Sequence, residues 1–183
     1  GKTYTSLRMN EKGAELLFAP RLRVARCLRR GFFEPEKMDR HGPCARSACM
    51  ADVLILGASG GIGSALSAAH HARGDAVTGL SRSRDGFDVT DAASVDAALT
   101  GLGPFDRVIV ATGALEIAGA VPEKTIRAVT AKAMADQFAV NAIGPALVLA
   151  HAHDLLKPDG VLAVLSARVG SIGDNRIGGW ISY

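Results

Sequence analysis

Residues 52–64 read Asp-Val-Leu-Ile-Leu-Gly-Ala-Ser-Gly-Gly-Ile-Gly-Ser, and this stretch decides the fold. Four apolar residues, Val53 to Leu56, run into a glycine cluster, and a helix-compatible segment, Ile62 to Arg73, follows. A buried strand that turns through glycines into a helix directs backbone N–H groups and the positive end of the helix dipole at one point, which suits a pyrophosphate. A Cβ in the turn would block the ligand's close approach. The contacts expected for such a ligand come from Gly57, Ser59, Gly60, Gly61, Ile62 and Gly63.

The chain from residue 51 onward alternates strand-like apolar runs with helical segments. Strands that are apolar throughout and separated by helices indicate a parallel sheet covered on both faces. We therefore expect an α/β fold, a three-layer doubly wound (Rossmann) parallel sheet that stops after its fifth strand, with the ligand beyond the carboxyl ends of the strands. The expected strands are 53–56, 76–80, 86–89, 107–111 and 160–165, and the expected helices are 62–73, 92–100 (capped by Asp91) and 133–156.

The composition fits one globular domain and excludes wholesale disorder, since 48% of the 183 residues are hydrophobic and 21% are charged. The net charge of +3 is unevenly divided. Residues 1–50 hold 11 Lys and Arg against 5 Asp and Glu, whereas residues 51–183 hold 10 against 13. The folded part gives no reason to expect a nucleic-acid surface. Its apolar runs are strand-length or interrupted, so we expect no membrane span.

Residues 1–49 differ from the rest of the chain because they are basic, contain several prolines and include all three cysteines. We expect an extension that is disordered or non-native, ahead of an incomplete NAD(P)-binding domain at 50–183 that begins at Met50. Free thiols predict a reducing, cytoplasmic location. No metal site is expected, because the histidine pairs 70–71 and 151–153 do not share a helix face.

Residues that could contact a ligand also follow the other expected strands, at the carboxyl ends where a parallel sheet binds its ligand. Ser81 and Arg82 follow the second strand, where a preference for NAD would require an acid for the ribose 2′-hydroxyl. Arg82 instead offers a planar donor fork suited to a 2′-phosphate, which favours NADP over NAD. Asp88 follows the third strand, where its carboxylate could accept from the adenine amino group, and Ala111, Thr112 and Gly113 follow the fourth, as small residues against which a cofactor can lie.

These motifs resemble those of the short-chain dehydrogenase/reductase superfamily. The glycine turn satisfies both Gly57-x-x-x-Gly61-x-Gly63, typical of the family, and Gly57-x-x-Gly60-x-x-Gly63, typical of its extended and atypical branches. Asp88-Val89-Thr90-Asp91 looks like the family's adenine-ring motif, and residues 111–114 stand where the family has Asn-Asn-Ala-Gly. Residues 165–172 and 178–183 are similar to the C-factor-like and sniffer-like carbonyl reductases.

The resemblance implies an NADP-dependent oxidoreductase that interconverts a small-molecule carbonyl and an alcohol. Its catalytic residues here would be Asn141, Ser166 and Tyr183, with Tyr183 as the acid and the serine hydroxyl on the carbonyl oxygen. Ala167 stands at the usual serine position, so Ser171 is a second candidate for the serine.

The family's Tyr-x-x-x-Lys motif breaks off after its tyrosine, so we interpret the chain as C-terminally incomplete. The family also implies a homo-oligomer for the full-length protein. The alternative function is that of a non-catalytic NADP-binding regulator of the atypical branch. A nucleotide-sugar epimerase fits the Gly57-x-x-Gly60-x-x-Gly63 spacing, but its substrate domain has no counterpart in these residues.

Overall fold

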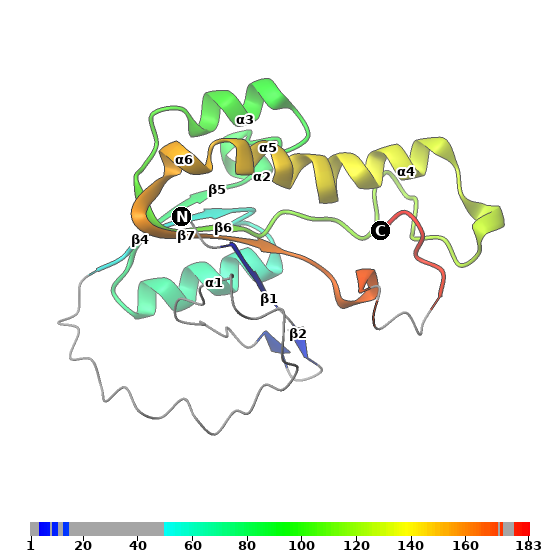
Figure 1. Cartoon of the computed structure of the whole chain (residues 1–183), viewed down its shortest axis with the longest axis horizontal. Coiled ribbons are helices and arrows are strands. Elements are labelled where there is room, and N and C mark those ends of the chain that lie inside the picture. The colour runs from blue at the N-terminus through cyan, green and yellow to red at the C-terminus, as the bar shows by residue number, and fades with distance from the viewer. Residues whose placement is uncertain (1–3, 8, 11–12, 15–49, 172, 174–177) are drawn as a thin grey trace, which may run out of the picture.

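The computed structural model describes residues 4–7, 9–10, 13–14, 50–171, 173 and 178–183. A parallel sheet lies at its centre, with strand order β1-β7-β6-β4-β5 (Figure 1). Its strands are β1 (Tyr4–Leu7), β4 (Asp52–Leu56), β5 (Ala76–Leu80), β6 (Phe105–Val110) and β7 (Leu156–Leu165). A short antiparallel pair, β2 (Met9–Asn10) with β3 (Gly13–Ala14), is separate from it.

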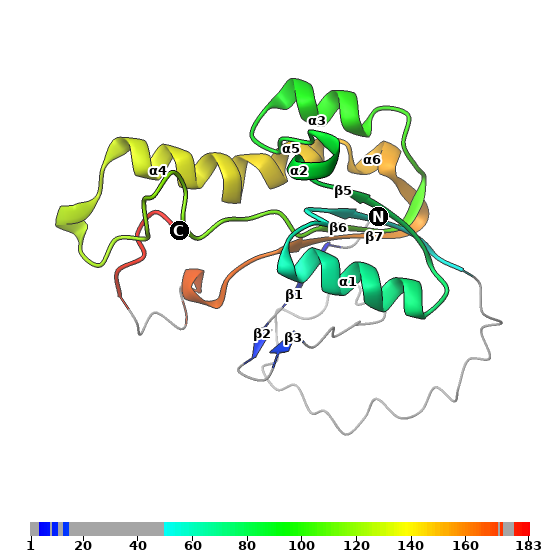
Figure 2. The same ribbon diagram turned by 180° about the vertical axis from the view of Figure 1, so that it is seen from behind.

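Helices cover both faces of the sheet. Figures 1 and 2 show α1 on one face and α3, α5 and α6 on the other. The predicted three-layer, doubly wound α/β fold is therefore confirmed. The helices are α1 (Gly61–Ala72), α2 (Arg82–Asp85), α3 (Ala92–Leu99), α4 (Ala131–Phe138), α5 (Gly144–Ala150) and α6 (Ala152–Leu155), with a π-helical segment η4 (Ala139–Ile143) and 3₁₀ turns η3 (Ile126–Ala128) and η5 (Arg168–Gly170).

Strand β4 divides its side chains between two cores because successive residues of a strand point to opposite faces. Val53 and Ile55 pack with Leu66 of α1 in the smaller core. Leu54 and Leu56 belong to the larger core, which the strands share with the residues of α3, α5 and α6. The four apolar side chains of β4, from Val53 to Leu56, are fully buried, which explains why they form an unbroken apolar run.

The predicted strand 86–89 is wrong. Helix α2 occupies residues 82–85, and Gly86 ends it with a left-handed φ of 69°. The backbone N–H groups that follow donate to side-chain oxygens and not to a neighbouring strand. The Asp88 N–H donates to Ser94 Oγ at 2.9 Å, and the Thr90 N–H donates to Asp88 Oδ1. These local hydrogen bonds compete successfully with a sheet ladder.

The predicted long helix 133–156 is continuous only in part. It begins at Ala131, passes through the π-helical η4 and ends in two short helices, and its last residue, Leu156, already belongs to β7. Pro145 is the second residue of α5 and has no N–H to donate to the Asn141 carbonyl in η4, so the α-helical pattern cannot run through unchanged.

By length and composition alone, Ala131–Ala150 is apolar enough to cross a membrane, contrary to the expectation that no run approaches that length. This is weak evidence, because core helices of soluble proteins meet the same criterion. Residues 144, 145 and 148 of this stretch are buried against the rest of the molecule.

Strand β1 belongs to the segment that was expected to lie outside the fold. It pairs in parallel with β7, with Tyr4 opposite Leu162 and Leu7 opposite Leu165, and forms one edge of the sheet. Residues 4–7 therefore have a place in the fold. Residues 15–49 lie outside the described residues, and the expectation of an extension there stays a prediction.

Candidate functional site

The glycine turn links β4 to α1 beneath the carboxyl end of β6. Gly57 has a φ of 87°, and a Cβ there would come within 2.9 Å of the Ala111 carbonyl and the Thr112 nitrogen. A Cβ on Gly63 would overlap the Gly57 carbonyl, so the first turn of α1 can lie against the strand end only without one. Gly60 caps α1 without a side-chain bond, and the first backbone N–H groups of the helix point outward from its end. The Gly60 N–H donates to the Gly57 carbonyl at 3.0 Å, and the exposed residues Ser59, Gly61 and Ile62 leave their amides for a ligand, so the turn forms a cradle.

Among the residues predicted after β5, Ser81 is not free to bind a ligand through its side chain. Ser81 is 2% exposed, and both its N–H and its hydroxyl donate to Asp85 Oδ2, at 2.8 and 3.1 Å. Arg82 is exposed at the start of α2. The Ser83 hydroxyl of the same helix donates to Ser59 Oγ at 3.2 Å, so α2 is tied directly to the glycine turn.

Asp88 and Val89 serve different purposes in the loop after α2. Hydrogen bonds from the Thr90 hydroxyl and N–H hold the pKa of Asp88 below its ordinary value, and the nearby charge of Arg82 acts in the same direction. Asp88 is therefore an ionised acceptor beside the cationic Arg82. Val89 is buried, and a Cβ on Gly144 would collide with it, so this loop is fixed closely against α5.

Asn141 clamps the loop that follows β6. Its Oδ1 accepts from the Ala114 N–H and its Nδ2 donates to the Ala114 carbonyl, both at 2.9 Å. Nδ2 also donates to Gln137 Oε1 at 2.6 Å, and Gln137 Nε2 donates to the Leu115 carbonyl at 2.9 Å. Both hydrogens of Asn141 Nδ2 and one lone pair of its Oδ1 are thus engaged in these bonds. Gln137 was missed at sequence level, although its position four residues before Asn141 on one helix face was the available signal.

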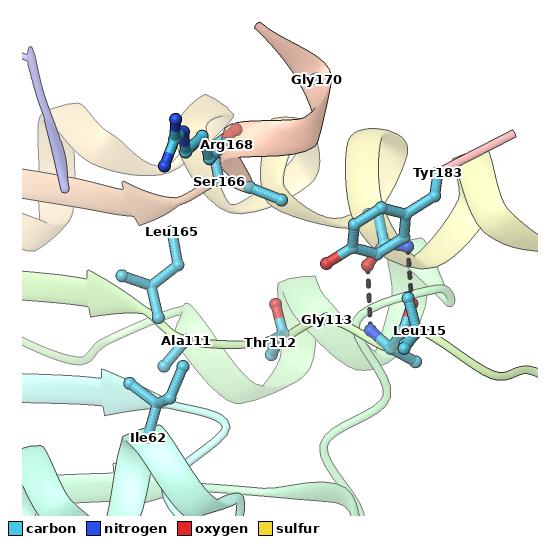
Figure 3. A pocket seen from close by; sticks show the side chains of 13 residues that line it. Ile62, Ala111, Thr112, Gly113, Leu115, Leu165, Ser166, Arg168, Gly170 and Tyr183 are labelled. Carbon is cyan, nitrogen blue, oxygen red and sulfur yellow. Dashed lines mark hydrogen bonds between the residues drawn. The ribbon is translucent and has the colours of Figure 1, made fainter. Parts of the chain in front are cut away.

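A cavity of about 420 Å³ joins the predicted catalytic residues to the residues after β6. Figure 3 shows Ser166 and Arg168 on one side of it, Ile62 and Ala111 on the other, and the ring of Tyr183 with its hydroxyl directed inward. Of the two serine candidates, Ser166 lines the cavity and Ser171 does not. The lining comprises Ile62, residues 111–115, Asn141, residues 165–168, Gly170 and Tyr183.

One buried polar atom in this cavity has no partner. Thr112 Oγ1 is shielded from solvent and makes no hydrogen bond within the described part of the chain. Such an atom in a ligand-sized hollow fits a bound polar molecule that completes its hydrogen bonding. Among the residues that the structure describes, no group of three or more His, Cys, Asp or Glu side chains could hold a metal ion.

Residues 53–169 match the NAD dependent epimerase/dehydratase family. The chain belongs to this family. The family's match covers both the glycine cradle and the residues after β6, β7 included. Membership in a superfamily of the short-chain dehydrogenase/reductase type is thereby confirmed, while the narrower likeness to C-factor-like and sniffer-like carbonyl reductases stays a prediction.

Three proteins that resemble this chain are described as dehydrogenases or as a short-chain dehydrogenase/reductase. The 1-hydroxy-2-glutathionyl-2-methyl-3-butene dehydrogenase of Rhodococcus sp. (strain AD45) is 27% identical over 73% of this chain and 64% of that protein. A small-chain dehydrogenase solved with NADPH is 25% identical over 66% of this chain and 52% of its own, with a TM-score of 0.58. A Burkholderia multivorans protein solved with bound NADP is also 25% identical, over 74% of this chain and 66% of its own, with a TM-score of 0.58. The chain spans less than two thirds of the length of the curated relative.

The residues present fit a nicotinamide dinucleotide. The turn has no room for a Cβ at Gly57 or Gly63, the first residues of α1 are exposed, and Thr112 Oγ1 makes no hydrogen bond within the described part of the chain. Arg82 supplies a cation near the cradle on α2, which is linked to the turn through Ser59. These groups would hold a pyrophosphate at the turn and a 2′-phosphate at Arg82.

Proposed function

We propose that the protein is an NADP-dependent oxidoreductase that interconverts a carbonyl and an alcohol. The observation that carries the proposal is that Asn141, Ser166 and Tyr183 line one cavity together with the residues after β6 and the glycine-turn residue Ile62. A protein that only senses the cofactor needs the pyrophosphate-binding turn but no polar cavity beside it. The hydroxyl groups that line this cavity favour an enzyme, because they can take part in acid–base chemistry.

The cofactor, when bound, supplies or accepts the hydride, and the protein must orient the substrate and manage one proton. Tyr183 is proposed to protonate the substrate oxygen during reduction, and the Ser166 hydroxyl to donate a hydrogen bond to that same oxygen. An unperturbed tyrosine has a pKa near 10, so a neighbouring cation has to favour the tyrosinate. By resemblance, that cation is the lysine of the family's Tyr-x-x-x-Lys motif.

Asn141 is proposed to act in proton transfer through its backbone. Both hydrogens of its Nδ2 are engaged with Ala114 and Gln137, and its Oδ1 already accepts from the Ala114 N–H, so the side chain has no donor left for a substrate or a water. Pro145 cannot donate to the Asn141 carbonyl as an α-helix would require. That carbonyl is the group we expect to hold a water on the proton path.

The relatives support the proposal by their own activities and ligands. The Rhodococcus relative is a dehydrogenase of a hydroxy compound, and two similar structures were solved with NADPH or NADP. The preference for NADP rests on Arg82 together with these two structures. The substrate is proposed to be a small carbonyl or alcohol compound, and the protein a cytoplasmic one.

The test follows NADPH oxidation with a panel of aldehydes and ketones, using a chain extended past Tyr183 through the motif's lysine. Tyr183→Phe should lower turnover by about 100-fold or more, because the proton donor is lost, while NADPH binding stays unchanged. NADPH binding without turnover of any carbonyl or alcohol would contradict the proposal and would instead support the non-catalytic regulator.

A further inference from the structure

Glu123 is a buried acid that the proposed chemistry does not use. It lies in the loop between β6 and η3, is 5% exposed, and its Oε2 accepts from both the N–H and the hydroxyl of Ser182, at 3.1 and 2.8 Å. Its own backbone N–H, the Ser182 hydroxyl and the N–H groups of Ser182 and Ile181 hold the pKa of this carboxyl below its ordinary value. Glu123 therefore stays ionised while it binds the residue next to Tyr183.

The backbone of Glu123 contacts the same segment. The Trp180 N–H donates to the Glu123 carbonyl at 2.6 Å, and a Cβ on Gly179 would come within 2.9 Å of that carbonyl oxygen. Trp180 adopts a φ of 56°, which an aromatic residue rarely takes without being held there. Glu123 thus fixes residues 179–182 through both its side chain and its main chain. Glu123 and Ser182 are 59 positions apart in the sequence.

The fixed segment leads directly to the cavity. The Trp180 and Tyr183 rings meet edge to face with centroids 5.6 Å apart, and the Tyr183 N–H donates to the Trp180 carbonyl at 3.3 Å. Tyr183 itself lines the cavity. Any shift of the Trp180 backbone would therefore move the Tyr183 ring relative to Ser166 on the facing side (Figure 3).

We propose that Glu123 is the positioning residue for Tyr183, clasping residues 179–182 so that the tyrosine hydroxyl is held in the cavity. The catalytic consequence rests on the proposed function, in which Tyr183 is the proton donor. The clasp itself is a statement about structure, and it can be tested without turnover.

Trp180 is the only tryptophan in the sequence, so its fluorescence reports on this segment alone. Glu123→Ala should shift the emission to longer wavelength and increase acrylamide quenching, because the segment is released to solvent. Glu123→Gln keeps one oxygen for the Ser182 donors and should lie between the wild type and Glu123→Ala. Glu116→Gln makes the same change at an exposed position of the same loop and should leave the fluorescence unchanged.

The kinetic arm uses the extended chain with its lysine. Glu123→Ala should lower kcat by about 10- to 100-fold, as expected for a misplaced catalytic group, with the KM for NADPH unchanged because the glycine cradle is not altered. Glu123→Gln should recover most of the loss. A fall in NADPH affinity that matches the fall in kcat would indicate a general structural role and overturn the proposal.

Gly179→Ala provides a second route to the same release if Glu123→Ala fails to fold. The added methyl would press on the Glu123 carbonyl while the carboxylate stays intact, and it should reproduce the fluorescence change. Unchanged Trp180 emission and quenching in folded Glu123→Ala and Gly179→Ala would overturn the clasp. If the wild type turns over no substrate, the proposed function fails, and the fluorescence still decides whether the clasp exists.

Discussion

Two glycines of the same turn, Gly61 and Gly63, have opposite surroundings. A Cβ on Gly63 would overlap the Gly57 carbonyl, whereas a Cβ on Gly61 meets no atom within 4 Å. Gly63→Ala should therefore destabilise the protein by about 1–3 kcal/mol through overpacking and should weaken NADPH binding. Gly61→Ala should be neutral or stabilising by up to about 1 kcal/mol, since alanine favours the helix. Urea unfolding of the two variants checks the contrast, and equal losses would contradict it.

Arg82 is the residue on which the preference for NADP depends. Arg82→Ala should weaken NADPH binding by about 10- to 100-fold, the value of one or two hydrogen bonds to a charged group, and should leave NADH binding nearly unchanged. Arg84→Ala removes a second exposed arginine from α2 and is the matched control. Titrations of both nucleotides give the comparison. A parallel loss of NADPH and NADH affinity in Arg82→Ala would mean that the arginine does not recognise the 2′-phosphate.

Single residues were predictable where the local rule and the tertiary environment agree. Asp91 caps α3 as expected, its carboxylate accepting from the Ala93 N–H at 3.0 Å, and Gly57 has the positive φ that the turn requires. Ser81 was placed correctly at a strand end, but its hydroxyl is engaged by Asp85. Glu123 carried no sequence signal, because its partner is 59 positions away.

At the scale of elements, the helix that carries Asn141 holds the loop after β6 through Gln137. Gln137→Ala should lower stability by about 1–2 kcal/mol, because it removes bonds to the Leu115 carbonyl and to Asn141, and should also lower kcat as Asn141 loses its support. Lys132→Ala, on the exposed side of α4, should change stability by less than about 0.5 kcal/mol. Thermal unfolding and steady-state kinetics measure both. Full activity in Gln137→Ala would show that Asn141 is held without it.

Strands were predictable from the sequence where a continuous apolar run coincides with a segment that is buried in the structure. The predicted strand 53–56 is observed within Asp52–Leu56, where the apolar run is continuous and buried. The predicted strand 76–80 is observed with the same bounds, and the Gly74-Asp75 turn precedes it. Strand β7 begins four residues earlier than expected, ahead of the Pro158-Asp159 pair that suggested a turn. The expected strand 86–89 failed because side-chain hydrogen bonds at Asp88 satisfy the backbone locally.

At the scale of the whole molecule, the two ends of the sheet carry different kinds of groups. The carboxyl ends of the strands meet the cavity, while the opposite ends carry paired charges. Lys157 bonds Asp52 and Asp106 at 2.7 and 2.8 Å, and buried His70 bonds Asp75 at 2.6 Å. These paired charges lie at the end of the sheet away from the cavity, so changes at His70 should leave NADPH affinity unaffected.

Adjacent histidines of α1 give a matched test of this division. His70 is 3% exposed and His71 is exposed. His70→Ala should cost about 2–4 kcal/mol, because the buried Asp75 carboxylate loses its closest partner, whereas His71→Ala should stay within about 0.5 kcal/mol. Urea unfolding measures both values. Similar stabilities for the two variants would rule out a stabilising His70–Asp75 pair.

The same pair also predicts a pH dependence. The His70 hydrogen bond is the main cause that holds the pKa of Asp75 below its ordinary value. A lowered folded-state pKa adds stability above the unfolded value of about 3.9, and that contribution is lost as the pH falls through the folded-state value. The stability difference between wild type and His70→Ala should shrink as the pH falls from the unfolded-state pKa of Asp75 into stronger acid. A difference that grows over this acid range would contradict the assignment.

The pairing of β1 with β7 has a consequence for the order of folding. Residue 4 lies opposite residue 162, a separation of 158 positions, whereas β4 and β5 pair across only 24, as in Asp52 with Ala76. Closing the longer loop costs more chain entropy, so the central ladders can form first and offer β7 as a ready template. The first strand in the chain is thus the last expected to join the sheet, and the edge that it covers stays open to competing strands until it arrives.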